Sequence, residues 1–140
     1  MRGALAASSG IVPDVGIAVD ITLANDVPGA SPQEEISHLG AGTSICILNG
    51  SHITNPKLFK RFVELAEQRQ IKYQKEVLPR GGTDAGGIQR APGGPAVITI
   101  SIPCRYAHTS VEMVHKGDIQ ATIDLLAAFL EDPGDLNYQL

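Results

Sequence analysis

The chain has 140 residues and a formal net charge of −4 at pH 7, a balance that argues against a nucleic-acid-binding surface. Its length suits one small domain, and 43% of its residues are hydrophobic, without any tryptophan. No apolar run approaches the roughly 20 residues that span a bilayer, and the first ten residues lack the apolar segment of a signal peptide.

Two cysteines, Cys46 and Cys104, each lie within an apolar run. This placement is typical of buried free thiols in a reducing compartment, not of a disulfide framework. We therefore expect a cytoplasmic protein.

Four segments have the composition of strands. Residues 16–25, 43–50 and 96–103 are almost continuously apolar and rich in β-branched side chains, whereas residues 73–78 alternate between apolar and polar side chains. Continuous apolar strands predict a sheet that is covered on both faces.

A helix is expected over residues 55–70, with Asn55 as its N-cap and Pro56 in its first turn. A second helix is expected over residues 117–132, with Asp118 as its cap. The core-facing stripe of this second helix is expected to comprise Ile119, Ile123, Leu126, Ala127 and Leu130. Strands that alternate with helices predict an α/β fold with a mixed or parallel sheet.

The remaining segments are rich in glycine and proline. In the loop at 79–95, Thr83 or Asp84 is placed to cap a short helix that begins near Ala85. The tail, residues 132–140, is expected to be frayed.

Asp20 closes the apolar part of the first strand, and His108 follows the strand at 96–103. Ligands bind at the carboxyl ends of strands in open α/β sheets, so both residues are candidate metal ligands. Asp20 is equally suited to initiate a turn, and His108 to form structural hydrogen bonds. A catalytic zinc site needs about three protein ligands. The other three histidines, which we expect at the surface, are His38, His52 and His115.

The adjacent carboxylates Glu34 and Glu35, with His38 close behind, have the residue types of a metallohydrolase centre. The alternative is a solvated loop, because a glycine- and proline-rich segment precedes them. A glycosidase has little support, since no carboxylate pair is fixed at the separation that glycoside hydrolysis needs.

Four motifs in chain order are decisive: "PDVGIAVDITLANDVPG", "LGAGTSICI", "YQKEVLPRGGTDAGGIQ" and "ISIPCRYAHTSVEM". Over about residues 2 to 131 the sequence resembles the dinuclear-metal aminopeptidases, which include glutamyl aminopeptidases and tetrahedral (TET) particles, some of them labelled endoglucanase. The resemblance implies a mixed-sheet zinc-peptidase catalytic domain with helices on both faces. It also implies two divalent ions, zinc or cobalt, peptide substrates, and dimers that assemble into a dodecamer.

The resemblance assigns a metal ligand to Asp20, in "AVD", and another to His108, in "RYAH". It suggests roles in supporting the metal ligands or lining the substrate pocket for Asp84, Arg105 and Tyr106. For Asp84 the alternative is a helix cap, and for the other two it is packing. One departure is Gln89, which stands where many relatives have histidine and leaves substrate preference open.

In the family a glutamate pair precedes an "RGA" segment, and this sequence begins "MRGALAASSG". The resemblance therefore puts the general-base glutamate upstream of Met1, and Glu34–Glu35 in a variable loop. We expect residues 1–140 to be a single partial catalytic domain, without the N-terminal part and the inserted dimerisation domain, and inactive alone. The alternative is a non-enzymatic α/β module that retains the fold for binding or assembly.

Overall fold

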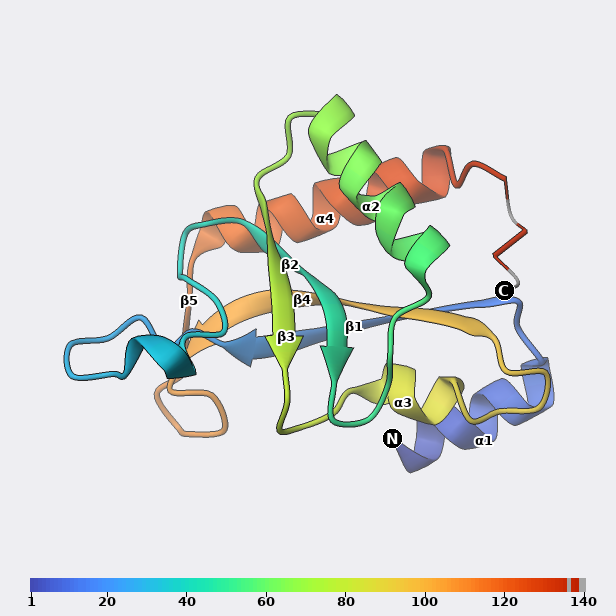
Figure 1. Ribbon diagram of the computed structural model, residues 1–140, viewed down its shortest axis with the longest axis horizontal. Coiled ribbons are helices and arrows are strands. Elements are labelled where there is room, and N and C mark those ends of the chain that lie inside the picture. The colour runs from blue at the N-terminus through green and yellow to red at the C-terminus, as the bar shows by residue number, and fades with distance from the viewer. Residues whose placement is uncertain (136, 139–140) are drawn as a thin grey trace.

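A mixed sheet of five strands organises the computed structural model, which describes residues 1–135, 137 and 138 (Figure 1). The strand order is β1-β4-β2-β3, and the short β5 pairs with the end of β4. The strands are β1 (Val15–Leu23), β2 (Thr43–Asn49), β3 (Tyr73–Leu78), β4 (Ala96–Arg105) and β5 (Met113–Val114). The sheet confirms the α/β class and the four long strands expected from the sequence.

Strand direction divides the sheet into two pairs. β1 runs parallel to β4, from Val15 opposite Ala96 to Leu23 opposite Cys104, and β2 runs parallel to β3. The two pairs are antiparallel to each other, with Ser44 on β2 opposite Ser101 on β4. The carboxyl ends of β1 and β4 therefore share one edge of the sheet, and those of β2 and β3 share the opposite edge.

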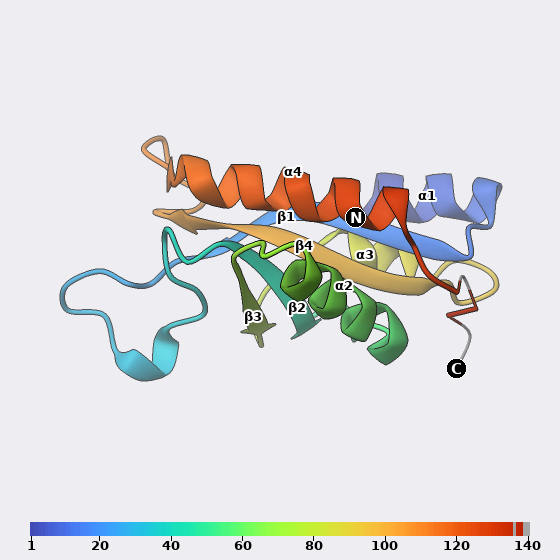
Figure 2. The same ribbon diagram turned by 90° about the horizontal axis from the view of Figure 1, so that it is seen from above.

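The helices α2 (Pro56–Gln68) and α4 (Lys116–Glu131) cover one face of the sheet (Figures 1 and 2). They enclose the main core, in which Phe62 stacks on Phe129 with ring centroids 4.5 Å apart. The other fully buried members of this core include Ile45, Leu58, Ile98, Ile100 and Leu125.

The second face carries α3 (Asp84–Ile88), and α1 (Arg2–Ile11) packs on α3. Ala18, Ala85 and Val97 form a smaller buried cluster there, with Ile88 packed against it. Gly16 allows this approach, because a Cβ atom at that position would lie 2.5 Å from Cγ2 of Ile88. The expectation of helices on both faces is confirmed.

The N-terminus of α2 forms as the sequence predicts. Asn55 is the N-cap, and its Oδ1 accepts hydrogen bonds from the backbone N–H groups of Lys57 at 3.0 Å and Leu58 at 3.1 Å. Both cysteines are buried and free, as expected.

The N-terminus of α4 differs from the prediction. His115 is the N-cap, and its Nδ1 accepts a hydrogen bond from Gly117 N–H at 3.1 Å. Asp118 instead lies buried, where it accepts hydrogen bonds from the backbone of a distant loop.

The predicted core stripe of α4 is also wrong, since Ile123 is 53% exposed and Leu130 is 77% exposed. The residues that the helix buries besides Asp118 are Ala121, Thr122, Leu125, Ala128 and Phe129. Apolar side chains surround much of α4, so the sequence offers two stripes of helical spacing. The stripe that contains Ala121 and Ala128 faces the sheet, and Phe129 stacks on Phe62 of α2.

The short helix α3 is present, with Thr83 as its N-cap residue and Asp84 in its first turn, although the Thr83 side chain makes no capping hydrogen bond. The described part of the tail is not frayed. Tyr138 is buried against Phe129, and its carbonyl accepts a hydrogen bond from Asn55 Nδ2 at 2.7 Å. Residues 136, 139 and 140 of the predicted frayed tail lie outside the described residues.

Asp118 joins α4 to the loop before β2. Its Oδ2 accepts a hydrogen bond from Gly40 N–H at 2.7 Å, and its Oδ1 accepts one from Gly42 N–H at 2.9 Å. Gly42 has φ of +100°, and a Cβ atom there would lie 2.2 Å from the carbonyl oxygen of Lys72. The loop is thus held in a conformation that favours glycine, with its N–H groups directed at one buried carboxylate.

Replacing Asp118 with alanine removes both acceptors and leaves two N–H groups unpaired. We expect the free energy of unfolding to fall by about 3–6 kcal/mol, because each of the two charge-assisted bonds contributes about 1.5–3 kcal/mol. Urea denaturation followed by circular dichroism measures the change. The matched control is Asp124→Ala in the exposed part of α4, and an Asp118→Ala loss no larger than that control would contradict the role of Asp118.

Candidate active-site edge

Asp20 lies on β1, opposite Ser101 of β4. Its side chain is exposed, and its Oδ1 accepts a hydrogen bond from the backbone N–H of Ile21 at 2.8 Å. The strand continues three residues beyond Asp20 to Leu23, so Asp20 lies near the carboxyl end of β1 and does not itself end the strand. The exposed carboxylate is accessible for a ligand.

His108 lies in the loop between β4 and β5, three residues after β4 ends. Its backbone adopts φ of +65°, in the left-handed region, and its N–H donates a 2.6 Å hydrogen bond to Glu112 Oε1. The residue is exposed. Because β1 and β4 are parallel, Asp20 and His108 lie toward the same edge of the sheet, as the sequence predicts for two candidate ligands.

Arg105 ends β4 and forms a bidentate ion pair with Asp26 in the loop after β1. Arg105 Nε lies 2.7 Å from Asp26 Oδ1, and Nη2 lies 3.0 Å from Oδ2. The Leu39 N–H also donates to Asp26 Oδ2 at 2.9 Å. Arg105 thus ties together the loops that follow β1 and β4, and its guanidinium is engaged in this pair.

Hydrogen bonding to Arg105 lowers the pKa of Asp26 to about 2, against the opposing effect of burial. A carboxyl group with a lowered pKa in the folded state stabilises the fold above its unfolded pKa, near 3.8. That contribution is lost as the pH falls from 3.8 toward 2.

Asp26→Asn therefore destabilises the chain by about 2 kcal/mol at pH 5, and the difference from the native sequence shrinks as the pH approaches 2. Urea midpoints measured at several pH values test this expectation. Asp14→Asn, at an exposed position after α1, serves as the control. A destabilisation by Asp26→Asn that does not change with pH would refute the pairing.

Two further candidate residues occupy different surroundings. Tyr106 is 51% exposed and, with φ of +58°, begins the loop that carries His108. Asp84 lies beyond the carboxyl end of β3, where its Oδ1 is 2.8 Å from the N-terminal ammonium of Met1. Since β3 runs antiparallel to β4, the structure places Asp84 at the edge opposite that of Asp20 and His108.

The Glu34–Glu35 segment is an exposed loop. Glu34 ends a single 3₁₀ turn (η1, Pro32–Glu34), and Glu35 Oε2 lies 3.6 Å from the exposed His38 Nε2. Within the described residues, no three His, Cys, Asp or Glu side chains are grouped so that they could hold a metal ion. Asp20 and His108 are thus two separate donors, not part of a complete site.

His52 is buried, which corrects the expectation of a surface residue. Its Nδ1 lies 3.0 Å from Asn49 Oδ1, and its Nε2 lies 3.3 Å from Thr54 Oγ1. Burial lowers the pKa of the imidazole. The "NGSH" sequence suggests only a turn, whereas the hydrogen-bonding partners of the ring become apparent once β2 and the following segment fold together.

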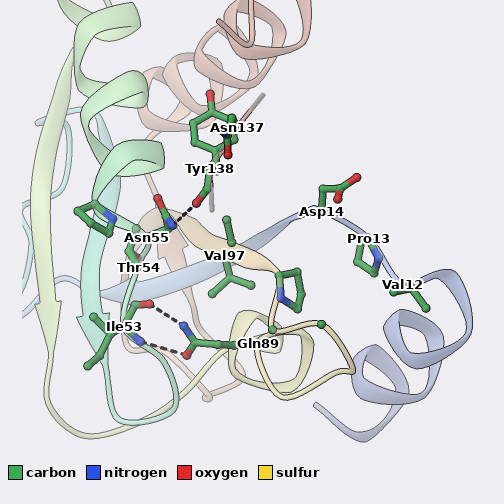
Figure 3. Close-up of a pocket in the computed structure, with 15 residues that line it drawn as sticks. Val12, Pro13, Asp14, Ile53, Thr54, Asn55, Gln89, Val97, Asn137 and Tyr138 are labelled. Carbon is green, nitrogen blue, oxygen red and sulfur yellow. Dashed lines mark hydrogen bonds between the residues drawn. The ribbon is translucent and has the colours of Figure 1, made fainter. Parts of the chain in front are cut away.

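A cavity of about 980 Å³ opens at the edge of the sheet opposite Asp20 and His108 (Figure 3). It lies between the starts of β1 and β4 and the segment after β2. Gln89 lines it and binds the Ile53 backbone, with Nε2 donating to the carbonyl at 2.8 Å and Oε1 accepting from N–H at 3.4 Å. The amide of Gln89 is therefore engaged in backbone hydrogen bonds.

Residues 1–125 match the model of the M42 glutamyl aminopeptidase family. The chain belongs to this family. Lysyl aminopeptidase of Pyrococcus furiosus is 40% identical over 136 residues, which cover 94% of this chain and 37% of that protein. M42 membership confirms the resemblance seen in the four sequence motifs.

Two solved structures of aminopeptidases share the fold. The aminopeptidase from Desulfurococcus kamchatkensis superposes with a TM-score of 0.89 at 38% identity, covering 96% of this chain and 38% of that one. The TET1 peptidase of Pyrococcus horikoshii, which assembles into a tetrahedron or a large octahedral shell, has a TM-score of 0.77 at 28% identity, covering 91% and 36%. The M42 chain thus spans less than two fifths of each of these proteins. None of its helices, over the described residues, has the length and hydropathy to cross a membrane.

Proposed function

We propose that the chain is the part of a metal-dependent aminopeptidase that supplies two of its metal ligands, Asp20 and His108. The observation that carries the proposal is the position of these two side chains, exposed and toward one edge of the sheet, within a family match that spans residues 1–125. The intact enzyme would release N-terminal residues from peptides, using two divalent ions and a water that bridges them.

The donor types fit such a centre. Carboxylate oxygen and imidazole nitrogen both bind zinc and related divalent ions. The N–H of Ile21 orients Asp20 through Oδ1, and none of the described residues donates a hydrogen bond to its Oδ2. The side chain of Glu112 holds the backbone of His108. The described residues include no cluster of three ligands, and the proposal assigns the other donors and the general-base glutamate to residues outside this set.

Bound divalent ions supply Lewis acidity and lower the pKa of a water molecule. The described residues perform supporting tasks. The Asp26–Arg105 pair fixes the two loops that follow β1 and β4, and so limits the positions that Asp20 and His108 can adopt. Tyr106, exposed beside His108, is a candidate to line the pocket for the substrate's N-terminal residue.

Homo-oligomeric assembly is part of the proposal, by analogy with the P. horikoshii TET1 peptidase. Exposed apolar side chains on α4, Ile123 and Leu130, and Val19 on β1 remain available for further contacts. Exposed apolar surface of this kind is typical of interfaces.

The purified 140-residue chain is expected to have no aminopeptidase activity, because the proposal assigns the general base and most metal ligands to residues outside it. Release of p-nitroaniline from amino-acid p-nitroanilides with added cobalt or zinc measures this directly. Metal-dependent turnover by the chain alone would overturn the assignment of the base to a residue outside it.

A chimaera tests the ligand assignment. Residues 1–125 replace the matching segment of the P. furiosus lysyl aminopeptidase, and hydrolysis of lysyl p-nitroanilide and bound metal per subunit are measured. Asp20→Ala and His108→Ala should each lower turnover by about 100-fold or more and reduce bound metal, because loss of a residue that only supports a ligand already costs about 10–100-fold.

The control is Glu34→Gln with Glu35→Gln, which should leave turnover and metal content nearly unchanged. A large loss in this double variant, with assembly intact, would move the site to the exposed loop. A folded chimaera that binds no metal would favour the alternative of a non-enzymatic module.

A further inference from the structure

Glu76 is the most deeply buried carboxyl group among the described residues. It lies on β3, opposite Cys46 of β2, and is 0% exposed. Neither of its carboxyl oxygens has a partner within normal hydrogen-bonding geometry, although the hydroxyls of Ser101 and Thr22 and the thiol of Cys46 lie close enough to oppose the rise in its pKa that burial causes. An ionised carboxylate in this position requires a counter-charge, because the desolvation of a buried, unpaired charge is strongly unfavourable.

Three buried hydroxyl groups share this condition. Thr22 on β1, Ser44 on β2 and Ser101 on β4 have side-chain oxygens without a hydrogen-bond partner. Ser44 and Ser101 are directly opposite each other, and Ser101 is also opposite Asp20, two residues from Thr22. Residues two apart on a strand share a face of the sheet. Glu76 is opposite Cys46, two residues from Ser44, so the five oxygen atoms from four strands lie on the same face.

The charges near Glu76 are negative or neutral. Burial raises the pKa of its carboxyl, the hydroxyls of Ser101 and Thr22 and the thiol of Cys46 oppose that rise in part, and the charge of Asp20 adds to it. None of the described lysines, arginines or histidines is ion-paired with Glu76. The protein itself thus supplies hard oxygen ligands but no cation.

We propose that Glu76, Thr22, Ser44 and Ser101 form a binding site for one monovalent cation, Na⁺ or K⁺. Carboxylate and hydroxyl oxygens are ligands for hard cations. Side chains directly opposite on antiparallel strands have Cβ atoms about 4.5–5.5 Å apart. Calcium lies about 2.3–2.6 Å from its oxygen ligands, and an ion of similar radius, such as Na⁺, spans such a gap. A monovalent ion neutralises the single buried carboxylate, whereas a divalent ion would leave a buried excess charge.

The ion would be bound by side chains from all four long strands, on the face of the sheet that carries Asp20. Its presence depends on the described chain and not on peptidase activity. The consequence is a stability that depends on the kind of cation present, not only on ionic strength.

Thermal unfolding of the 140-residue chain at pH 8 in sodium, potassium and choline chloride of equal ionic strength tests the site. We expect Tm to be higher in sodium or potassium than in choline, by about 5 °C at ten times the dissociation constant. Glu76→Gln keeps the shape of the side chain and should abolish the difference. Glu34→Gln, at an exposed position, should retain it.

Equal Tm values in the three salts would overturn the proposal, as would a cation dependence that persists in Glu76→Gln. A Tm that rises on acidification equally in choline and in sodium would identify a proton as the occupant and also overturn it. If Glu76→Gln does not fold, crystals of the P. furiosus chimaera that retains Glu76, grown in rubidium chloride, give a second measurement. An anomalous peak among the four side chains supports the site, and the absence of any density there in crystals from both rubidium chloride and sodium chloride contradicts it.

Discussion

The pairing of β4 with β1 on one side and β2 on the other is the constraint on which the other features depend. β4 is buried on both faces: Ile98 and Ile100 contact the core under α2 and α4, while Val97, Thr99 and Ser101 are directed to the opposite face. Such a strand keeps its register, because a shift by one residue would exchange the two sets of side chains. Its parallel pairing with β1 brings the ends of both strands, and with them Asp20 and His108, toward one edge.

The antiparallel pairing with β2 gives the two edges of the sheet different roles. The edge with Asp20 carries the loop that begins at Tyr106 and the Arg105–Asp26 pair. The opposite edge carries the cavity lined by Gln89 and the buried His52. Between the two edges, the opposed residues Ser101 and Ser44 place unpaired hydroxyl groups beside Asp20 in the neighbouring strands β4 and β2. The proposed metal centre and the proposed monovalent cation site thus depend on the same strand register.

The strands and α2 were predictable because their signals are local: continuous apolar runs, and Asn55 followed by Pro56. The remaining features depend on distant partners. Asp118 has the residue type of a cap but binds Gly42, 76 positions away in the sequence, so His115 takes the capping position. The face that α4 buries was settled by Phe129 meeting Phe62. α1 has small residues and a weak apolar pattern, and it packs on α3 without a side-chain cap. The motifs around Asp20 and His108 indicated the family, whereas nothing near Glu76 in the sequence indicates burial without a partner.

Anomalous diffraction at the zinc absorption edge, from crystals of the P. furiosus chimaera grown with zinc, tests the central claim most directly. The account predicts two zinc peaks, one about 2.0–2.2 Å from an Asp20 oxygen and the other about 2.0–2.1 Å from a His108 nitrogen. Zinc ions held only by side chains of the host protein, with Asp20 and His108 directed away from them, would contradict it.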